Sequence, residues 1–106
     1  MATGLGDKIF QLRKDKKLTL DALAEKAGLS KSYLWELENR ESPRPSAEKL
    51  SAIADVLGVA TSYFMEEDVR VPEERHVDEA FFRNYKNLDS DAKEQLRKIL
   101  DTFKKE

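Results

Sequence analysis

The stretch from Leu18 to Glu38 constrains the fold most, because two short helical patterns meet in it across a single glycine. Thr19 is suited to accept the first free backbone amides of a helix, and Gly28 is suited to end that helix in the left-handed conformation. Between them runs an apolar stripe at helical spacing: Leu20, Leu23 and Ala24. The sequence therefore predicts a helix over residues 20–27, followed at once by a tight turn.

A second helix is predicted over residues 31–39, directly after that turn. Ser30 is its expected cap, and Leu34 and Leu37 lie three residues apart on its inner side. The residues on its other faces are Lys31, Ser32, Trp35 and Glu36. A short, firmly packed helix with an outward polar set suits the DNA major groove, which admits a helix and presents a distinct donor and acceptor pattern for each base pair.

Three more helical patterns complete the first 65 residues. They are expected at about residues 6–16, at 47–57, and in a short stretch with Tyr63 and Phe64. Ser46 and Thr61 are the expected caps of the last two, and Gly58 follows the 47–57 pattern where a left-handed residue is needed. The prolines between Glu41 and Pro45 predict a loop. Five helices in about 60 residues predict a small all-α core.

The order of these signals resembles the helix-turn-helix domain of Cro and lambda-type repressors, the XRE family, over about residues 6–65. The matching pieces are Leu-Thr, Leu-Ala, Ala-Gly-Leu-Ser, Tyr-Leu, Leu-Glu-Asn, Pro45-Ser46 and Tyr63-Phe64. Two positions depart from the family pattern. Leu20 stands where the family often has a phosphate-binding glutamine, and Arg40 stands where it often has glycine. The resemblance implies a five-helix lambda-repressor-like DNA-binding domain in residues 1–65, with the helix-turn-helix at about 19–38.

The expected DNA contacts fall into two groups. Outward placement near the start of the second helix predicts base contacts from Lys31, Ser32, Trp35 and Glu36, with an ordinary solvated face as the alternative and loop packing as a rival role for Trp35. The resemblance implies phosphate contacts from Tyr33, Asn39, Arg40 and Thr19, which would fix register without reading sequence. Glu38 is expected to pair within the domain, because on DNA it would face phosphates.

Residues 66–77 are predicted to form an acidic linker, and residues 78–106 a C-terminal helical hairpin. His76 is expected to be exposed and inert, and the Glu66/Glu67 and Glu73/Glu74 pairs to be a solvated charge run without convergent partners. Asp89 is the expected cap of the last helix. The two helices have more apolar surface than they can bury against each other, which predicts a dimer or partner interface: Phe81, Phe82, Tyr85, Leu96, Ile99, Leu100 and Phe103.

Charge is unevenly distributed along the chain. The net charge of -2 and a pI near 5.5 are unusual for a nucleic-acid binder, but residues 1–65 have a net charge of +1 and residues 66–106 a net charge of -3. The chain has no cysteine, which excludes disulfides and thiolate metal sites and is compatible with a reducing cytoplasm. No apolar run approaches the roughly 18 residues that span a membrane.

The sequence therefore predicts an all-α, cytoplasmic, sequence-specific DNA-binding regulator, bacterial or phage-encoded. It is expected to act as a homodimeric repressor on a palindromic or nearly palindromic operator. It has no nucleophile with a plausible base, no phosphate-binding glycine loop and no metal-ligand spacing, so no enzyme activity, cofactor or metal is expected. The alternative is an antitoxin or adaptor whose tail occupies a partner protein, with DNA binding serving autoregulation.

Overall fold

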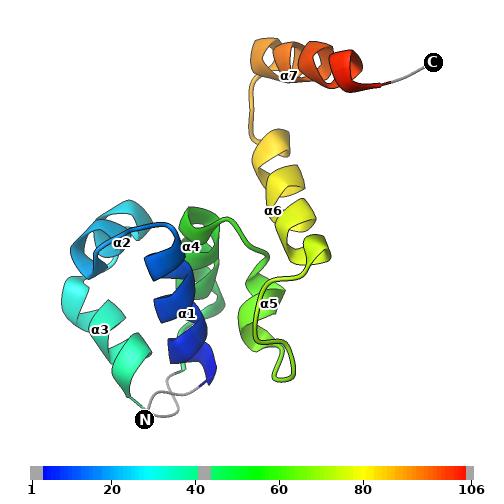
Figure 1. Ribbon diagram of the computed structural model, residues 1–106. Helices are drawn as coiled ribbons and strands as arrows, with labels where there is room; N and C mark the ends of the chain where they lie inside the picture. The colour runs from blue at the N-terminus through cyan, green and yellow to red at the C-terminus, as the bar shows by residue number, and fades with distance from the viewer. Residues whose placement is uncertain (1–3, 41–43, 105–106) are drawn as a thin grey trace.

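The computed structural model describes residues 4–40 and 44–104, and every regular element in that part of the chain is an α-helix (Figure 1). Residues 41–43 of the predicted 41–45 loop lie outside the described residues. The helices are α1 (Gly4–Asp15), α2 (Leu20–Ala27), α3 (Lys31–Asn39), α4 (Ala47–Leu57), α5 (Thr61–Met65), α6 (Glu74–Lys86) and α7 (Ser90–Phe103).

The predicted limits of α2, α3 and α4 are confirmed, and the local chemistry explains them. The Thr19 hydroxyl accepts a hydrogen bond from the Ala22 amide at 3.0 Å, and Ser30 and Ser46 cap α3 and α4 in the same way. Gly28 and Gly58 both have φ of 72°, the left-handed conformation that ends α2 and α4. Asp89 caps α7, as expected.

The predicted cap of α5 was wrong. Thr61 is the first residue of α5, and the cap position is Ala60, which makes no side-chain cap bond. Ala60 is fully buried, and its backbone amide donates a hydrogen bond to the carbonyl of His76 at 3.0 Å. A small apolar residue fits there because α6 covers this point of the chain.

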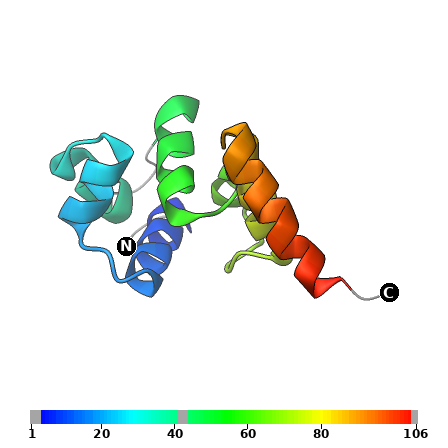
Figure 2. The same cartoon turned by 90° about the horizontal axis from the view of Figure 1, so that it is seen from above.

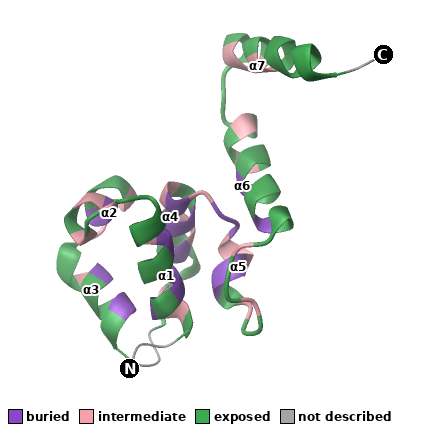
Figure 3. Cartoon of the chain, in the orientation of Figure 1, coloured by how far each residue is buried: buried purple, intermediate pink, exposed green. Residues whose placement is uncertain are grey.

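The hydrophobic core is formed by helices α1, α2, α3, α4 and α5 (Figure 3). Its largest fully buried apolar side chains come from all five helices: Ile9, Leu23, Leu34, Ile53, Leu57 and Tyr63. At roughly 1.5 to 3 kcal/mol for each fully buried aliphatic or aromatic side chain, burial of this core makes a large favourable contribution to the free energy of folding.

The first helix approaches the C-terminal end of α3 very closely. A Cβ atom on Gly6 would lie 2.5 Å from the carbonyl oxygen of Glu38 and 2.8 Å from that of Leu37. Beside this contact the Arg13 guanidinium donates two hydrogen bonds to the Glu38 carboxylate, at 2.7 and 3.0 Å. The predicted pairing of Glu38 within the domain is confirmed.

The last two helices extend the molecule away from this core, to overall dimensions of 52 × 28 × 24 Å. Figures 1 and 2 both place α7 on the side of the molecule opposite α3. No residue of α7 is buried, whereas α6 buries His76 and Ala80. Among the described residues, no helix is both long and apolar enough to cross a membrane, and no cluster of three or more possible ligands is placed to hold a metal ion.

The contact at Gly6 predicts a position-specific loss of stability. Gly6→Ala should lower the free energy of unfolding by about 1 to 3 kcal/mol, because the added methyl meets fixed backbone atoms of α3. Gly4→Ala is the matched control, since its Cβ would lie 3.7 Å from the end of the Arg70 side chain. Urea denaturation of the two variants tests this, and equal stability would contradict the close approach.

Candidate nucleic-acid interface

The outward face of α3 is the exposed surface that the predicted base-contacting residues share. Leu34 is fully buried and Leu37 is 3% exposed, so the helix is held firmly on its inner side. Lys31, Ser32, Trp35 and Glu36 are all exposed. The structure therefore brings these four side chains together on one accessible surface.

The charged residues of this face are held only by weak, exposed ion pairs. The Lys31 ammonium lies 3.4 Å from Asp21 of α2, and the Arg40 guanidinium lies 3.8 Å from Glu36. Exposed pairs of this kind contribute about 0 to 1 kcal/mol. The cost of releasing Lys31, Glu36 or Arg40 to another partner is therefore small.

The residues that the family resemblance places on phosphates lie around the same face. Tyr33 is half-buried, and burial raises the pKa of its hydroxyl. Asn39 uses its side-chain amide to donate to the carbonyl of Trp35 at 2.9 Å. The Thr19 hydroxyl accepts the Ala22 amide, so this oxygen already has a structural role as the cap of α2. Only its hydroxyl proton remains for an outside acceptor.

Sequence reasoning missed Lys49, which belongs to the same surface. Its ammonium lies 4.5 Å from the centre of the Tyr33 ring, and its side chain is exposed in the first turn of α4. A cation beside a tyrosine and near the positive end of a helix attracts an anion such as phosphate. The available signal was a lysine three residues after the capping Ser46.

Trp35 is 49% exposed and lies in a shallow depression of about 420 Å³ beside Phe10 and Leu20. Its apolar neighbours therefore come from α1 and α2. Leu20, at the start of α2, has no side-chain donor for a phosphate, unlike the glutamine common in similar domains. Phe10, Leu20 and Trp35 give one edge of the α3 surface an apolar character.

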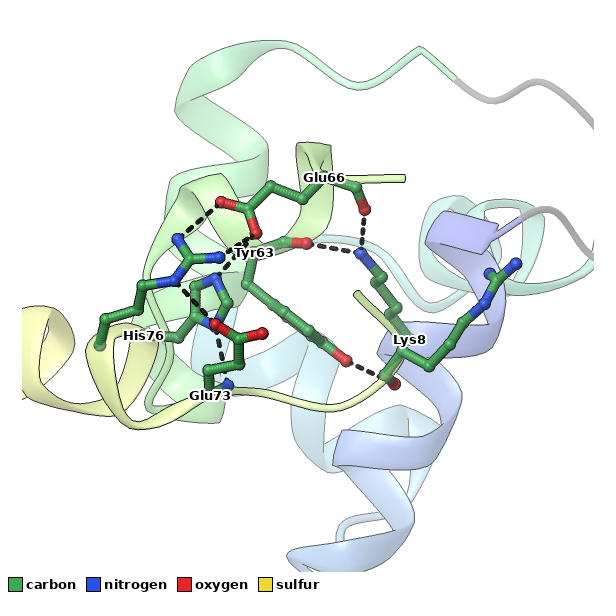
Figure 4. Close-up of polar contacts among 7 residues, drawn as sticks. Lys8, Tyr63, Glu66, Glu73 and His76 are labelled. Carbon is green, nitrogen blue, oxygen red and sulfur yellow. Dashed lines mark hydrogen bonds and ion pairs between the residues drawn. The ribbon is translucent and has the colours of Figure 1, made fainter. Parts of the chain in front are cut away.

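His76 corrects the sequence interpretation, because it is fully buried and hydrogen-bonded (Figure 4). The backbone amide of Glu73 donates to Nδ1 of His76 at 2.8 Å, and Nε2 lies 3.1 Å from a carboxylate oxygen of Glu66. Because Nδ1 accepts, the proton of the neutral ring is on Nε2 and donates to Glu66. Burial of His76 against Tyr63 of α5 was not evident from an isolated histidine in a polar stretch.

Glu66 and Glu73 also differ from the prediction. They were expected to be solvated charges without partners, but both are partners of Arg75. The Arg75 guanidinium donates to both Glu66 oxygens at 2.8 and 3.0 Å, and to Glu73 at 2.8 Å (Figure 4). These bonds, together with His76, lower the pKa of Glu66 to about 2. A charge run in sequence becomes a bonded cluster because α6 folds back onto α5.

The segment that follows α5 is also tied to the domain. Lys8, which is 4% exposed, donates to the carbonyl of Tyr63 at 2.6 Å and to the carbonyl of Glu66. Its burial lowers the pKa of the ammonium group. The Tyr63 hydroxyl donates to the carbonyl of Arg70 at 2.9 Å. The boundary of a linker at residues 66–77 stays a prediction, but this stretch has specific partners in α1 and α5.

The predicted tail interface forms one apolar groove of about 410 Å³ between α6 and α7. The groove is lined by all seven residues that the sequence singled out, together with Arg97: Phe81, Phe82, Tyr85, Leu96, Ile99, Leu100 and Phe103. Phe81, Phe82, Ile99 and Leu100 are each more than half exposed, and Phe103 is 74% exposed. Ala80, by contrast, is 1% exposed and does not line the groove.

Comparisons with known proteins agree with this arrangement. A family model described as helix-turn-helix matches residues 9–64. An HTH-type transcriptional regulator SinR from Bacillus licheniformis is 35% identical over 103 residues, covering 92% of this chain and 89% of the relative. The immunity repressor protein of Bacillus phage phi105 is 42% identical over 71 residues, covering 67% of this chain. This match spans only 49% of the phage repressor.

Solved structures show the same similarity. The crystal structure of SinR in complex with DNA, where SinR is called the master regulator for biofilm formation, has a TM-score of 0.56 and 39% identity. The match covers 58% of this chain and 98% of the SinR chain in that structure. The complex of SinR protein with SinI protein has a TM-score of 0.55 and 30% identity, covering 93% of this chain and 81% of that chain.

The lowered pKa of Glu66 predicts a pH-dependent contribution to stability. A carboxylate whose folded pKa lies below its ordinary value of 4.5 stabilises the fold above about pH 4.5 and loses that effect as the pH falls towards 2. Wild type should therefore melt at a higher temperature than Glu66→Gln at neutral pH, and the gap should close in this acidic range. Melting curves across the pH series test the assignment, and a constant gap would contradict it.

Proposed function

Because the chain belongs to the helix-turn-helix family of DNA-binding transcriptional regulators, we propose that it represses transcription as a two-fold dimer on a palindromic or nearly palindromic operator. The observation that supports this most is the exposed polar face of α3 on a helix fixed by buried leucines. We place its action in the bacterial cytoplasm and assign it no catalytic role, since its relatives are regulators.

In this proposal α3 enters the major groove and its outward face reads base edges. Lys31 is suited to donate to guanine O6 and N7, and Glu36 to accept from cytosine N4. Ser32 can donate or accept, so it is the least restrictive reader of the three. Trp35, with Phe10 and Leu20 beside it, is suited to contact a thymine methyl or the sugar edge of the groove.

Phosphate contacts would hold the helix in register. We assign them to Tyr33, Asn39, Arg40, Thr19 and Lys49, which surround the base-reading face. These side chains gain electrostatic free energy without distinguishing sequences. Lys49 is included because its ammonium is next to the Tyr33 ring.

The groove between α6 and α7 is proposed as the dimer interface. A second copy would cover aromatic and aliphatic side chains that are largely exposed in the single chain. The second candidate is an adaptor whose groove takes a partner protein. The similarity to the SinR and SinI complex over 93% of this chain supports that candidate.

The base-reading assignment predicts altered sequence preference in single variants. Lys31→Ala, Ser32→Ala and Glu36→Gln should each weaken binding to the preferred DNA by on the order of 1 to 3 kcal/mol and change preference at one position. Selection of duplexes from a randomised library, followed by titration of the winners, measures both quantities. Lys98→Ala on α7 removes the same charge as Lys31→Ala far from α3 and should keep wild-type preference.

Tyr33→Phe provides the contrast for the phosphate assignment. Its affinity for preferred and for random DNA should fall by the same factor, because a phosphate contact is independent of sequence.

If none of Lys31→Ala, Ser32→Ala and Glu36→Gln changes base preference, α3 is not the element that reads the DNA sequence.

Removal of α7 tests the tail assignment. A chain ending at Leu88 keeps the buried contacts of α6 but loses half of the groove, so it should sediment as a monomer. It should bind a single half-site as wild type does and lose affinity for the full operator, since two half-sites no longer share one effective concentration. A truncated chain that stays dimeric would place the dimer contact in the first five helices and leave the groove for an outside partner.

A further inference from the structure

Helix α6 has two faces that differ in burial. His76, Ala80 and Arg83 recur at positions i, i+4 and i+7, which is one stripe of a helix. This stripe faces the DNA-binding core, by which we mean α1 to α5, because His76 contacts the ends of α5 and Arg83 contacts Asp55 of α4. His76 is fully buried and Ala80 is 1% exposed. Phe81 and Phe82, which belong to the groove, are largely exposed. The same helix therefore contacts the DNA-binding core on one side and offers an apolar surface on the other.

The inner stripe is fixed by polar bonds at both ends. At its start, His76 and Arg75 bond to Glu66 (Figure 4). The His76 carbonyl also accepts the Ala60 amide. One turn beyond Ala80, the Arg83 side chain lies 2.6 Å from the Asp55 carboxylate of α4. Arg83 also donates to the carbonyl of Val59 at 3.1 Å. Two anchors more than a helical turn apart restrain both the position and the direction of α6.

We infer that these contacts, which we call the α6 joint, make α6 a rigid arm. Such an arm fixes the distance and the rotation between the two DNA-binding domains of a dimer. It therefore restricts the spacing of half-sites that the protein accepts. The inference rests on the proposed function, because it needs a dimer built on the groove. It assigns operator selectivity to residues that do not touch DNA: Asp55, Glu66, Arg75, His76 and Arg83.

DNA geometry makes such an arm selective. Half-sites read from one side of the duplex lie about 10 to 10.5 base pairs apart, so each inserted base pair shifts a half-site by about 3.4 Å and rotates it by about 35°. A rigid dimer meets this change only by deforming itself or the DNA. A dimer with loose arms accepts it, but with lower effective concentration at the second half-site.

The joint consists of few contacts, so single substitutions should loosen it. His76→Ala removes the buried ring and both of its hydrogen bonds. Glu66→Gln keeps the shape of the side chain but removes the charge that pairs with Arg75. Glu79→Gln is the matched control, because it removes the same charge from an exposed position on α6.

A distance measurement tests the joint without DNA. The chain has no native cysteine, so spin labels can be attached through Glu25→Cys on α2 and Asn84→Cys on α6, both exposed positions. Labelled chain is diluted with unlabelled chain to remove distances between protomers. Wild type and Glu79→Gln should give one narrow distance distribution, and His76→Ala and Glu66→Gln should give broader ones.

Binding to a series of two half-site duplexes tests the consequence. The half-sites come from the selection described above, and the spacing is changed by one, two and five base pairs. Wild type and Glu79→Gln should lose roughly tenfold or more in affinity away from the best spacing, whereas His76→Ala and Glu66→Gln should vary by less than about threefold. Affinity for a single half-site should be the same in all four proteins.

The outcomes separate the joint from the proposed function. A broad distance distribution in wild type, or an unchanged spacing profile in both loosened variants, would overturn the inference while single half-site binding remained. Failure of wild type to bind any duplex would overturn the proposed function and the spacing role together. Thermal melting of Glu66→Gln tests whether its altered half-site spacing profile comes from a folded domain.

Discussion

The close contact between α1 and the C-terminal end of α3 is the constraint on which the rest of the structure depends. Gly6 lets the two backbones approach, and the Arg13–Glu38 pair fixes their direction while keeping the carboxylate away from the outer face of α3. With that contact set, the leucines of α3 are buried and its polar residues face outward. The geometry of the proposed DNA-reading surface therefore follows from an intramolecular contact on the opposite side of the same helix.

The first five helices could be predicted from sequence because their signals are local. Thr19, Ser30, Ser46 and the two left-handed glycines act within a few residues of themselves, so the limits of α2, α3 and α4 were correct. The exception, the cap at Thr61, depended on burial of Ala60 beneath a helix that comes later in the chain. Local rules fail where a distant element supplies the missing partner.

The same distinction explains the errors at the start of the tail. His76, Glu66 and Glu73 lie in a polar stretch without periodicity, and their function arises only when α6 packs against α5. The proposed DNA surface shows the opposite case, because outward positions on one short helix follow from its inward leucines. Lys49 was missed since its relation to Tyr33 joins two helices that sequence periodicity treats separately.

The exposed ion pairs on the α3 face have a consequence for the ionic-strength dependence of binding. Lys31 and Arg40 are each beside a carboxylate of the protein before any DNA arrives. A cation that moves from a protein carboxylate to a DNA phosphate leaves that carboxylate unpaired, and the carboxylate then attracts counterions from solution. The net number of ions released is therefore smaller than for a lysine or arginine that was unpaired before binding. The slope of affinity against salt, which reports the number of ions released, would be shallower than a count of contacting lysines and arginines suggests. An acidic protein of this kind gives up general attraction to DNA and depends more on the fit of its reading helix.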